Sequence, residues 1–269
     1  MTPEQFIMIC VYVLAGLVGL CVGSFLNVVI YRVPNGMSLS NPPSHCTKCD
    51  YQLKWYDNVP VLSYLFLDGK CRKCREPISP RYMCVELLNA ALWLLSVFLF
   101  WEQGNGVAIA YACLSALVCS LLVCVFFIDL EHMLIFNRFV LMLSACGIAM
   151  AFLDGYTKWY DHLIGFVVAA VSFLGIYYGA LAVLKKEGMG FGDVKLALAA
   201  GLILGWQRFI LAVLIASILA SIVLIIVRRA RRDESGHEYP FGPFFAVGIL
   251  VSMFVGAPAI TWYVGLLSF

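Results

Sequence analysis

The chain has 269 residues, of which 62% are hydrophobic and 13% charged, with a formal net charge of +2. Soluble domains carry about twice that share of charged residues, so the composition excludes an ordinary soluble globular protein and indicates a polytopic membrane protein. The net charge itself decides little, because in such a chain the position of each charge matters more than the sum.

The first apolar segment runs roughly from Phe6 to Ile30. It exceeds the length of about 20 residues that crosses a bilayer. No basic residue precedes it, so we interpret it as a retained first span rather than a cleavable signal. Asn27 is polar within this segment and is expected to hydrogen-bond to another helix. Small residues are spaced to let a neighbouring helix pack closely: Gly16, Gly19, Gly23 and Ser24.

Residues 32–84 form a polar loop that contains two C-x-x-C motifs separated by 21 residues. Four thiolates at this spacing predict a closed, tetrahedral structural zinc site formed by Cys46, Cys49, Cys71 and Cys74. A closed set leaves no position for a catalytic water, and with four thiols present His45 is expected to be a bystander. The other seven cysteines lie in or beside apolar segments, where free cysteine behaves as a small hydrophobic residue.

Further apolar segments predict an all-α fold of about eight transmembrane helices with this small zinc-binding loop domain after the first. The expected division is residues 1–31 for the first helix, 32–84 for the zinc domain and 85–269 for the main membrane domain. The segment 194–205 is short for a full crossing. The expected spans after the loop are 85–101, 107–128, 138–153, 162–184, 194–205, 207–227 and 241–267.

The basic residues predict the orientation. Alternating the eight spans gathers all of the 18 Lys and Arg residues except Lys158 and Arg208 on one side. Cytoplasmic loops carry this excess, so that side is expected to be cytoplasmic and both termini to point outward. The zinc loop then lies in the cytoplasm, whereas Asp154 and Asp161 are expected on the outer side and to have no part in catalysis.

Two aspartates stand at the cytoplasmic ends of separate spans. Asp129 ends the third span, and Asp193 follows a glycine-rich break that contains Gly190 and Gly192. Two carboxyl groups within a few ångströms can share one proton while the other activates water, which is the chemistry of an aspartic peptidase. Asp193 has a second interpretation as a helix N-cap. His132 is another candidate base, although a polar residue on a helix face is the more ordinary interpretation.

Two other function classes are compatible with such a chain. Intramembrane carboxylates also mark ion-coupled transporters, but those sites usually lie near the midplane between repeats, and no repeat is visible here. A non-enzymatic assembly subunit of a secretion system, which would dock partners through its zinc loop, is the other alternative.

The ordered motifs of the chain resemble those of bacterial type IV prepilin leader peptidase/N-methyltransferases. Gly190-Phe191-Gly192-Asp193 matches the G-x-G-D motif of membrane aspartic proteases. The other matching stretches are Gly23 to Pro34, both cysteine motifs, Trp55 to Ser63, Gly69 to Arg72, Ile78 to Tyr82, Ile128-Asp129, Glu187 to Asp193 and Pro240 to Pro243.

The resemblance implies a bifunctional enzyme of the bacterial inner membrane. Its catalytic residues would be Asp129 and Asp193, with Gly190 and Gly192 as active-site glycines. It would remove the basic leader of type IV prepilins or type II secretion pseudopilins and then methylate the exposed amino group with S-adenosylmethionine. The zinc-containing region is the family feature that implies methylation, but no glycine-rich nucleotide motif indicates the cofactor-binding residues. No nucleic-acid partner is expected.

A basic leader would meet acidic groups at the cytoplasmic surface. Glu131 and Glu187 are the carboxylates nearest to the two aspartates in sequence. They are hypothesised to dock the leader. The alternative is ordinary boundary charge, paired with a nearby lysine or arginine.

Overall fold

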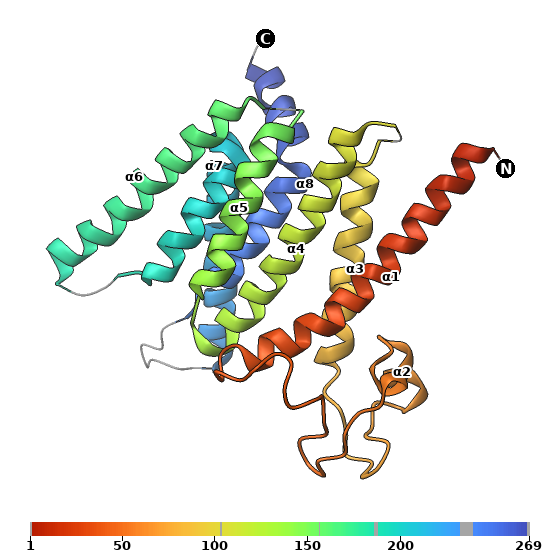
Figure 1. Ribbon diagram of the computed structural model, residues 1–269. Helices are drawn as coiled ribbons and strands as arrows, with labels where there is room; N and C mark the ends of the chain where they lie inside the picture. The colour runs from red at the N-terminus through yellow and green to blue at the C-terminus, as the bar shows by residue number, and fades with distance from the viewer. Residues whose placement is uncertain (1, 103, 156, 186–187, 232–238, 268–269) are drawn as a thin grey trace.

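Helices make up nearly all of the regular structure. The structure is a computed structural model that describes residues 2–102, 104–155, 157–185, 188–231 and 239–267. These ranges contain no strand, only two isolated bridges in the loop after the first helix, so the predicted all-α fold is confirmed. The elements are α1 (Pro3–Arg32), η1 (Trp55–Asn58), α2 (Leu62–Phe66), α3 (Arg81–Phe100), α4 (Gly106–His132), α5 (Asn137–Leu153), α6 (Trp159–Leu184), α7 (Phe191–Arg231) and α8 (Gly242–Leu267) (Figure 1).

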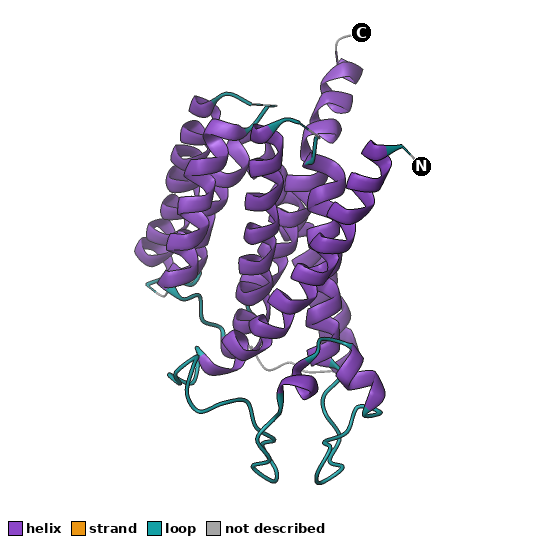
Figure 2. Cartoon of the chain, turned by 45° about the vertical axis from the view of Figure 1, so that its right-hand side comes forward, coloured by secondary structure: helices purple, strands orange, loops and turns teal. Residues whose placement is uncertain are grey.

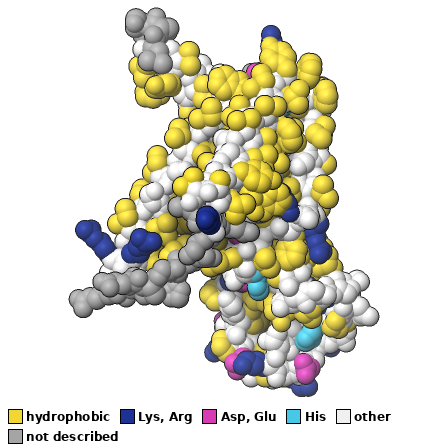
Figure 3. Space-filling view, turned by 90° about the vertical axis from the view of Figure 1, so that its left-hand side faces the viewer, with side chains coloured by type: hydrophobic (Ala, Val, Ile, Leu, Met, Phe, Trp, Pro, Cys, Tyr) yellow, Lys and Arg dark blue, Asp and Glu magenta, His cyan; other side chains and the backbone are white. Residues whose placement is uncertain are grey.

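The chain termini lie at one end of the helical bundle and the polar loop at the other (Figures 1 and 2). Within the described residues, six helices are long and apolar enough to cross a membrane, and α5, with 17 residues, is shorter. On the face shown in Figure 3, hydrophobic side chains cover the upper part, and most Lys and Arg side chains lie toward the lower end. This separation agrees with the loops that the sequence assigned to one side.

Helix α7 reverses its direction at Gly205. The backbone there has φ 72° and ψ 170°, a combination that only glycine adopts readily. Before the reversal, α7 runs from Asp193 to the far end of the bundle, where Gly205 faces the Asp161 carbonyl. After it, the chain runs back along α8, and the Ser252 hydroxyl donates a hydrogen bond to the Arg208 carbonyl. The two predicted segments 194–205 and 207–227 are therefore antiparallel halves of one hairpin.

Close contacts between helices depend on glycine where the sequence suggested it. A Cβ on Gly19 would lie 2.8 Å from the Cα of Ala90, and one on Gly23 would lie 2.7 Å from the Cα of Glu86, so α1 packs tightly on α3. Asn27 also joins the two helices, because its amide donates a hydrogen bond to the Tyr82 carbonyl at 3.0 Å.

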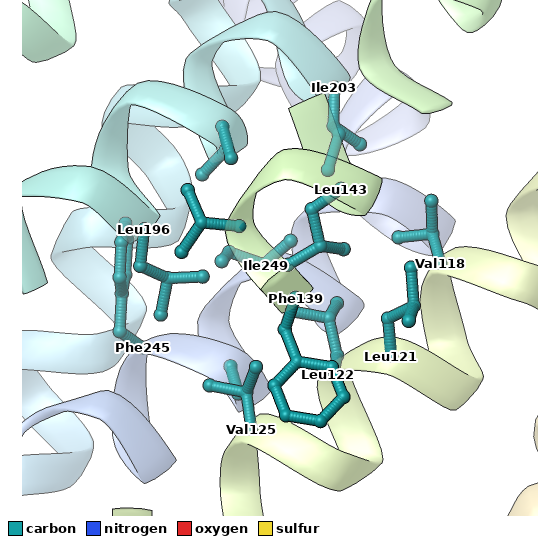
Figure 4. Packing of buried hydrophobic residues seen from close by; sticks show 14 of the residues in the cluster. Val118, Leu121, Leu122, Val125, Phe139, Leu143, Leu196, Ile203, Phe245 and Ile249 are labelled. Carbon is teal, nitrogen blue, oxygen red and sulfur yellow. The ribbon is translucent and has the colours of Figure 1, made fainter. Parts of the chain in front are cut away.

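The central core joins the helices that carry the two aspartates. Side chains of α4, α5, α7 and α8 interdigitate, and none of these labelled side chains is polar (Figure 4). Such close packing limits relative movement of the helices, so groups at their ends hold fixed positions. The labelled residues are Val118, Leu121, Leu122, Val125, Phe139, Leu143, Leu196, Ile203, Phe245 and Ile249.

Asp154 has a structural role that the sequence did not indicate. It lies at the end of the bundle opposite the polar loop, as expected, but its side chain is fully buried and forms an ion pair with Arg208. The imidazole of His162 lies beside the same carboxylate and 2.8 Å from the Leu202 carbonyl. Removing one member of a buried pair leaves the other charge uncompensated, so substitution of Asp154 is expected to destabilise the fold.

Candidate active site

Asp129 lies in the last turn of α4 and is only 5% exposed. The helix ends three residues later at His132, since Met133 adopts the left-handed conformation at φ 52°. The backbone N–H of Gly242, the first residue of α8, donates a hydrogen bond to the Asp129 carboxylate. A carboxylate is favoured at a helix N-terminus, where free N–H groups carry partial positive charge.

Asp193 lies in the first turn of α7, inside the helix rather than at its N-cap. Its backbone N–H donates to the Gly190 carbonyl at 3.0 Å. Its Oδ1 atom is buried and makes no hydrogen bond with the described residues. A buried carboxylate oxygen of this kind is costly in a purely structural role. This oxygen is available to accept a proton or to hold a reacting water.

The structure brings the two aspartates together. Their carboxyl groups are close enough to interact electrostatically, although they belong to different helices. Ile135, in the turn after α4, packs between the two sites. A Cβ added to Gly192 would lie 3.1 Å from the Ile135 side chain, and one added to Gly242 would lie 3.3 Å from the same side chain. The arrangement supplies two neighbouring carboxyl groups that can hold one shared proton.

The motif glycines have different surroundings. A Cβ on Gly190 would be 3.4 Å from the Asp193 carboxylate, whereas one on Gly192 would crowd Ile135. Gly242 is the tightest of the three, because a Cβ there would be 2.4 Å from Oδ2 of Asp129. Sequence reasoning included Gly242 in a motif but did not identify it as a site residue. Only the packing of α8 against α4 reveals its role.

The two candidate docking carboxylates differ in what the structure describes. Glu131 lies two residues beyond Asp129 and forms an ion pair with Arg81 at the start of α3, a partner that the sequence did not suggest. Its side chain is 40% exposed. Glu187 lies outside the described residues.

The four predicted cysteines form one cluster. Their sulfur atoms all lie within 4.8 Å of one another, and the Cys46–Cys74 and Cys49–Cys71 pairs are 3.8 and 4.0 Å apart. A tetrahedral zinc with Zn–S bonds of about 2.3 Å would separate its sulfurs by about 3.8 Å, so the geometry fits zinc. Backbone N–H groups of Cys74 and Lys73 lower the pKa of the Cys71 thiol to about 7, which favours the thiolate that a metal requires. His45 is not part of the cluster.

A hydrogen-bonded aspartate stabilises the loop between the two motifs. Burial alone would raise the pKa of Asp57, but hydrogen bonds from Arg72, the Lys54 backbone N–H and Tyr51 outweigh it and lower that pKa. The Arg72 guanidinium donates at 2.7 Å and also lies over the Tyr56 ring. The second cysteine motif is thereby attached to the aromatic segment that precedes it.

Comparisons with known proteins agree on one family. A family model described as the bacterial Peptidase A24 N-terminal domain matches residues 17–100, and that of the type IV leader peptidase family matches residues 116–225. A relative from Stutzerimonas stutzeri is 34% identical over 95% of this chain and 96% of its own length. A relative from Myxococcus xanthus is 38% identical over 83% of this chain and 67% of its own length. One from Pseudomonas aeruginosa is 33% identical over 89% of this chain and 89% of its own length. All three are named prepilin leader peptidase/N-methyltransferase. No solved structure matches the chain.

Proposed function

We propose, from the premise that this chain belongs to the type IV leader peptidase family, that Asp129 and Asp193 are its catalytic pair. The observation that carries the proposal is the electrostatic interaction between the buried Asp129 carboxyl group at the end of α4 and the Asp193 carboxyl group, with its buried Oδ1, at the start of α7. Gly190, Gly192 and Gly242 shape the site around them.

The chain is a prepilin leader peptidase and N-methyltransferase of the bacterial inner membrane, with several membrane-spanning helices. S-adenosylmethionine is the methyl donor that this activity implies. The substrate class extends, in our proposal, from type IV prepilins to type II secretion pseudopilins. The membrane domain 85–269 performs cleavage, and the first helix (1–31) and the zinc domain (32–84) serve methylation.

Hydrolysis follows from the shared proton of the pair. The ionised carboxylate takes a proton from a water that attacks the scissile carbonyl, and the protonated carboxyl group donates to the carbonyl oxygen. The N–H of Gly242 and the start of α8 stabilise negative charge on Asp129, while Oδ1 of Asp193 has no competing partner in the described structure. Collapse of the tetrahedral intermediate breaks the C–N bond, and the leaving amine takes a proton from the pair.

The orientation proposed from the sequence places this site and the cysteine cluster in the cytoplasm, with both termini outside. The distribution of basic residues supports it, since most Lys and Arg side chains on the face shown in Figure 3 lie toward the lower end of the molecule. A prepilin presents its basic leader to that side.

Incubation with substrate tests the function. Purified protein in detergent should convert a prepilin into a leader-free product, and methyl-labelled S-adenosylmethionine should label its new N-terminus. Peptide mass spectrometry measures both steps. A transporter or a non-enzymatic assembly subunit would leave the prepilin intact.

Gly242→Ala should lower the cleavage rate about 10²-fold, because a displacement of about 1 Å at a reacting group has an effect of that size. The new Cβ would overlap the Asp129 carboxylate, at 2.4 Å from Oδ2. Gly175→Ala is the matched control, since no atom lies within 4 Å of the corresponding Cβ. Initial rates on a fluorescent prepilin peptide measure the effect. Equal rates for the two variants would contradict the assigned position of Asp129.

Glu131→Gln should selectively weaken cleavage of a leader rich in Lys and Arg if Glu131 docks that leader. The loss should be greater at low salt, where charges are screened less, and a charge-neutralised leader should be cleaved at nearly the wild-type rate. An exposed pair such as Arg81–Glu131 contributes only about 0–1 kcal/mol to stability, so unfolding does not explain such selectivity. Glu102→Gln, two residues beyond the other end of α3, is the control. Equal losses on both leaders would assign Glu131 to the geometry of the pair instead.

A further inference from the structure

The loop between α1 and α3 that carries the four clustered cysteines is called the cysteine lobe here. A cavity of about 500 Å³ lies between this lobe and the ends of α1 and α3 that face it. This volume falls within the range of about 300–1,000 Å³ that is usual for small-molecule and cofactor sites. Helix α1 contributes Ser24, Asn27, Val28 and Tyr31, helix α3 contributes Tyr82, Met83 and Glu86, and the lobe contributes Cys46, Cys71 and Tyr64, among others. The wall thus combines aromatic rings with a few polar groups.

Three acidic residues line this cavity, and they differ in how their charge is balanced. Asp57 is neutralised by Arg72, and Glu76 is exposed to solvent. Glu86 is 8% exposed and forms no ion pair with any described residue. It accepts hydrogen bonds only from neutral donors, the Val61 backbone N–H at 2.7 Å and the Ser24 hydroxyl. A buried carboxylate without a cation favours a positively charged ligand.

The basic residues in this wall do not neutralise Glu86, since Arg72 pairs with Asp57, Lys48 is exposed to solvent, and Arg32 at the end of α1 is bound to the loop. Arg32 donates to the carbonyls of Ser38, Leu39 and Pro42, so its guanidinium holds the first turn of the lobe. The cavity therefore offers an anionic centre at Glu86 and aromatic faces at Tyr31, Tyr64 and Tyr82. That combination suits a planar base joined to a cation.

We propose that this cavity binds S-adenosylmethionine, with the Glu86 carboxylate facing its sulfonium and amino groups. The proposal rests on the methyltransferase part of the function above and assigns that activity a place. The neutral N-terminal amine of the cleaved substrate attacks the methyl carbon, and the electron pair of the C–S bond passes to sulfur. The sulfonium becomes a neutral thioether, and the methylated ammonium releases its proton to water.

The cavity also lies on the route that the cleaved substrate would take. Tyr82 in its wall follows Arg81, which is paired with Glu131, and Glu131 is two residues from Asp129. The start of α3 therefore contacts both the cavity and the end of α4 that carries Asp129. Both reactions can use one bound substrate helix.

Binding measured with the complete protein tests the site. Glu86→Gln keeps an acceptor for the Val61 N–H but removes the charge. It should weaken binding of S-adenosylmethionine on the order of tenfold, the effect of losing a charge-assisted contact. Binding of S-adenosylhomocysteine, whose sulfur is neutral, should fall less. Isothermal titration measures both, and Glu102→Gln should bind both ligands like the wild type.

A variant that changes volume rather than charge gives independent support. Val28→Phe should fill the cavity and abolish binding of both ligands, whereas Val13→Phe, on the exposed surface of α1, should leave binding intact. Prepilin cleavage should stay within about twofold of wild type in all four variants (Glu86→Gln, Glu102→Gln, Val28→Phe and Val13→Phe), since the proposed cleavage residues belong to α4, α7 and α8 and none of these four positions does.

Three results would overturn the assignment. Unchanged binding in both Glu86→Gln and Val28→Phe would place the donor elsewhere. Unchanged binding with loss of methylation alone would make the cavity a site for the substrate N-terminus. Joint loss of cleavage and binding in Glu86→Gln would reduce Glu86 to an anchor of the loop at Val61. Failure of the wild-type protein to cleave would instead count against the proposed function.

Discussion

Asp129→Asn and Asp193→Asn are each expected to lower the rate of leader cleavage by at least about 10²–10⁴-fold, the usual contribution of a general acid or base. An amide can neither share the proton of the pair nor accept one from water. The two carboxyl groups act on each other, so loss of either one disables both. The measurement is single-turnover cleavage of a prepilin by purified variants in detergent.

Asp161→Asn is the appropriate control for both variants. Asp161 lies at the opposite end of the bundle, and its carboxylate caps the start of α6 by accepting from the Lys158 backbone N–H at 3.1 Å, which asparagine can also do. Asp154→Asn is unsuitable, since breaking its buried pair with Arg208 destabilises the fold by about 3–5 kcal/mol. Near-normal cleavage by either Asp129→Asn or Asp193→Asn would refute the catalytic pair.

The double substitution Cys46→Ser/Cys71→Ser is expected to abolish metal binding and unfold the cysteine lobe. Purified wild-type protein should carry about one zinc, because its four sulfurs already have tetrahedral spacing. Structural zinc contributes about 10–16 kcal/mol in small domains, more than the Asp57–Arg72 pair and the neighbouring hydrogen bonds of this loop can replace. Elemental analysis measures the metal, and limited proteolysis measures the order of the loop.

Cys10→Ser provides the matched control, since Cys10 is exposed on α1 and lies outside the cluster. Methylation should be lost with the metal, because the lobe forms one wall of the proposed donor cavity. Cleavage should persist, because the two aspartates and Gly242 belong to α4, α7 and α8. Full zinc occupancy in the double variant would disprove the assigned ligands.

The helical fold and the cysteine cluster could be predicted from the sequence because both depend on local spacing. An apolar run of about 20 residues forms a helix in a bilayer, since no water satisfies its backbone groups. Two C-x-x-C motifs place four thiolates around one ion in any loop that can close. The sequence also predicted two separate segments, 194–205 and 207–227, and the structure shows them as the two halves of α7 on either side of Gly205.

The surroundings of the two aspartates were decided by tertiary structure. Asp129 and Asp193 could be compared by depth, but their proximity depends on how α4 and α7 each pack against α5 and α8, and no sequence period encodes that packing. Gly242 reaches Asp129 from α8, Glu131 pairs with Arg81 across 50 positions, and Asp154 pairs with Arg208 across 54. Each is a long-range contact, fixed only when close-packed helices bring distant residues together.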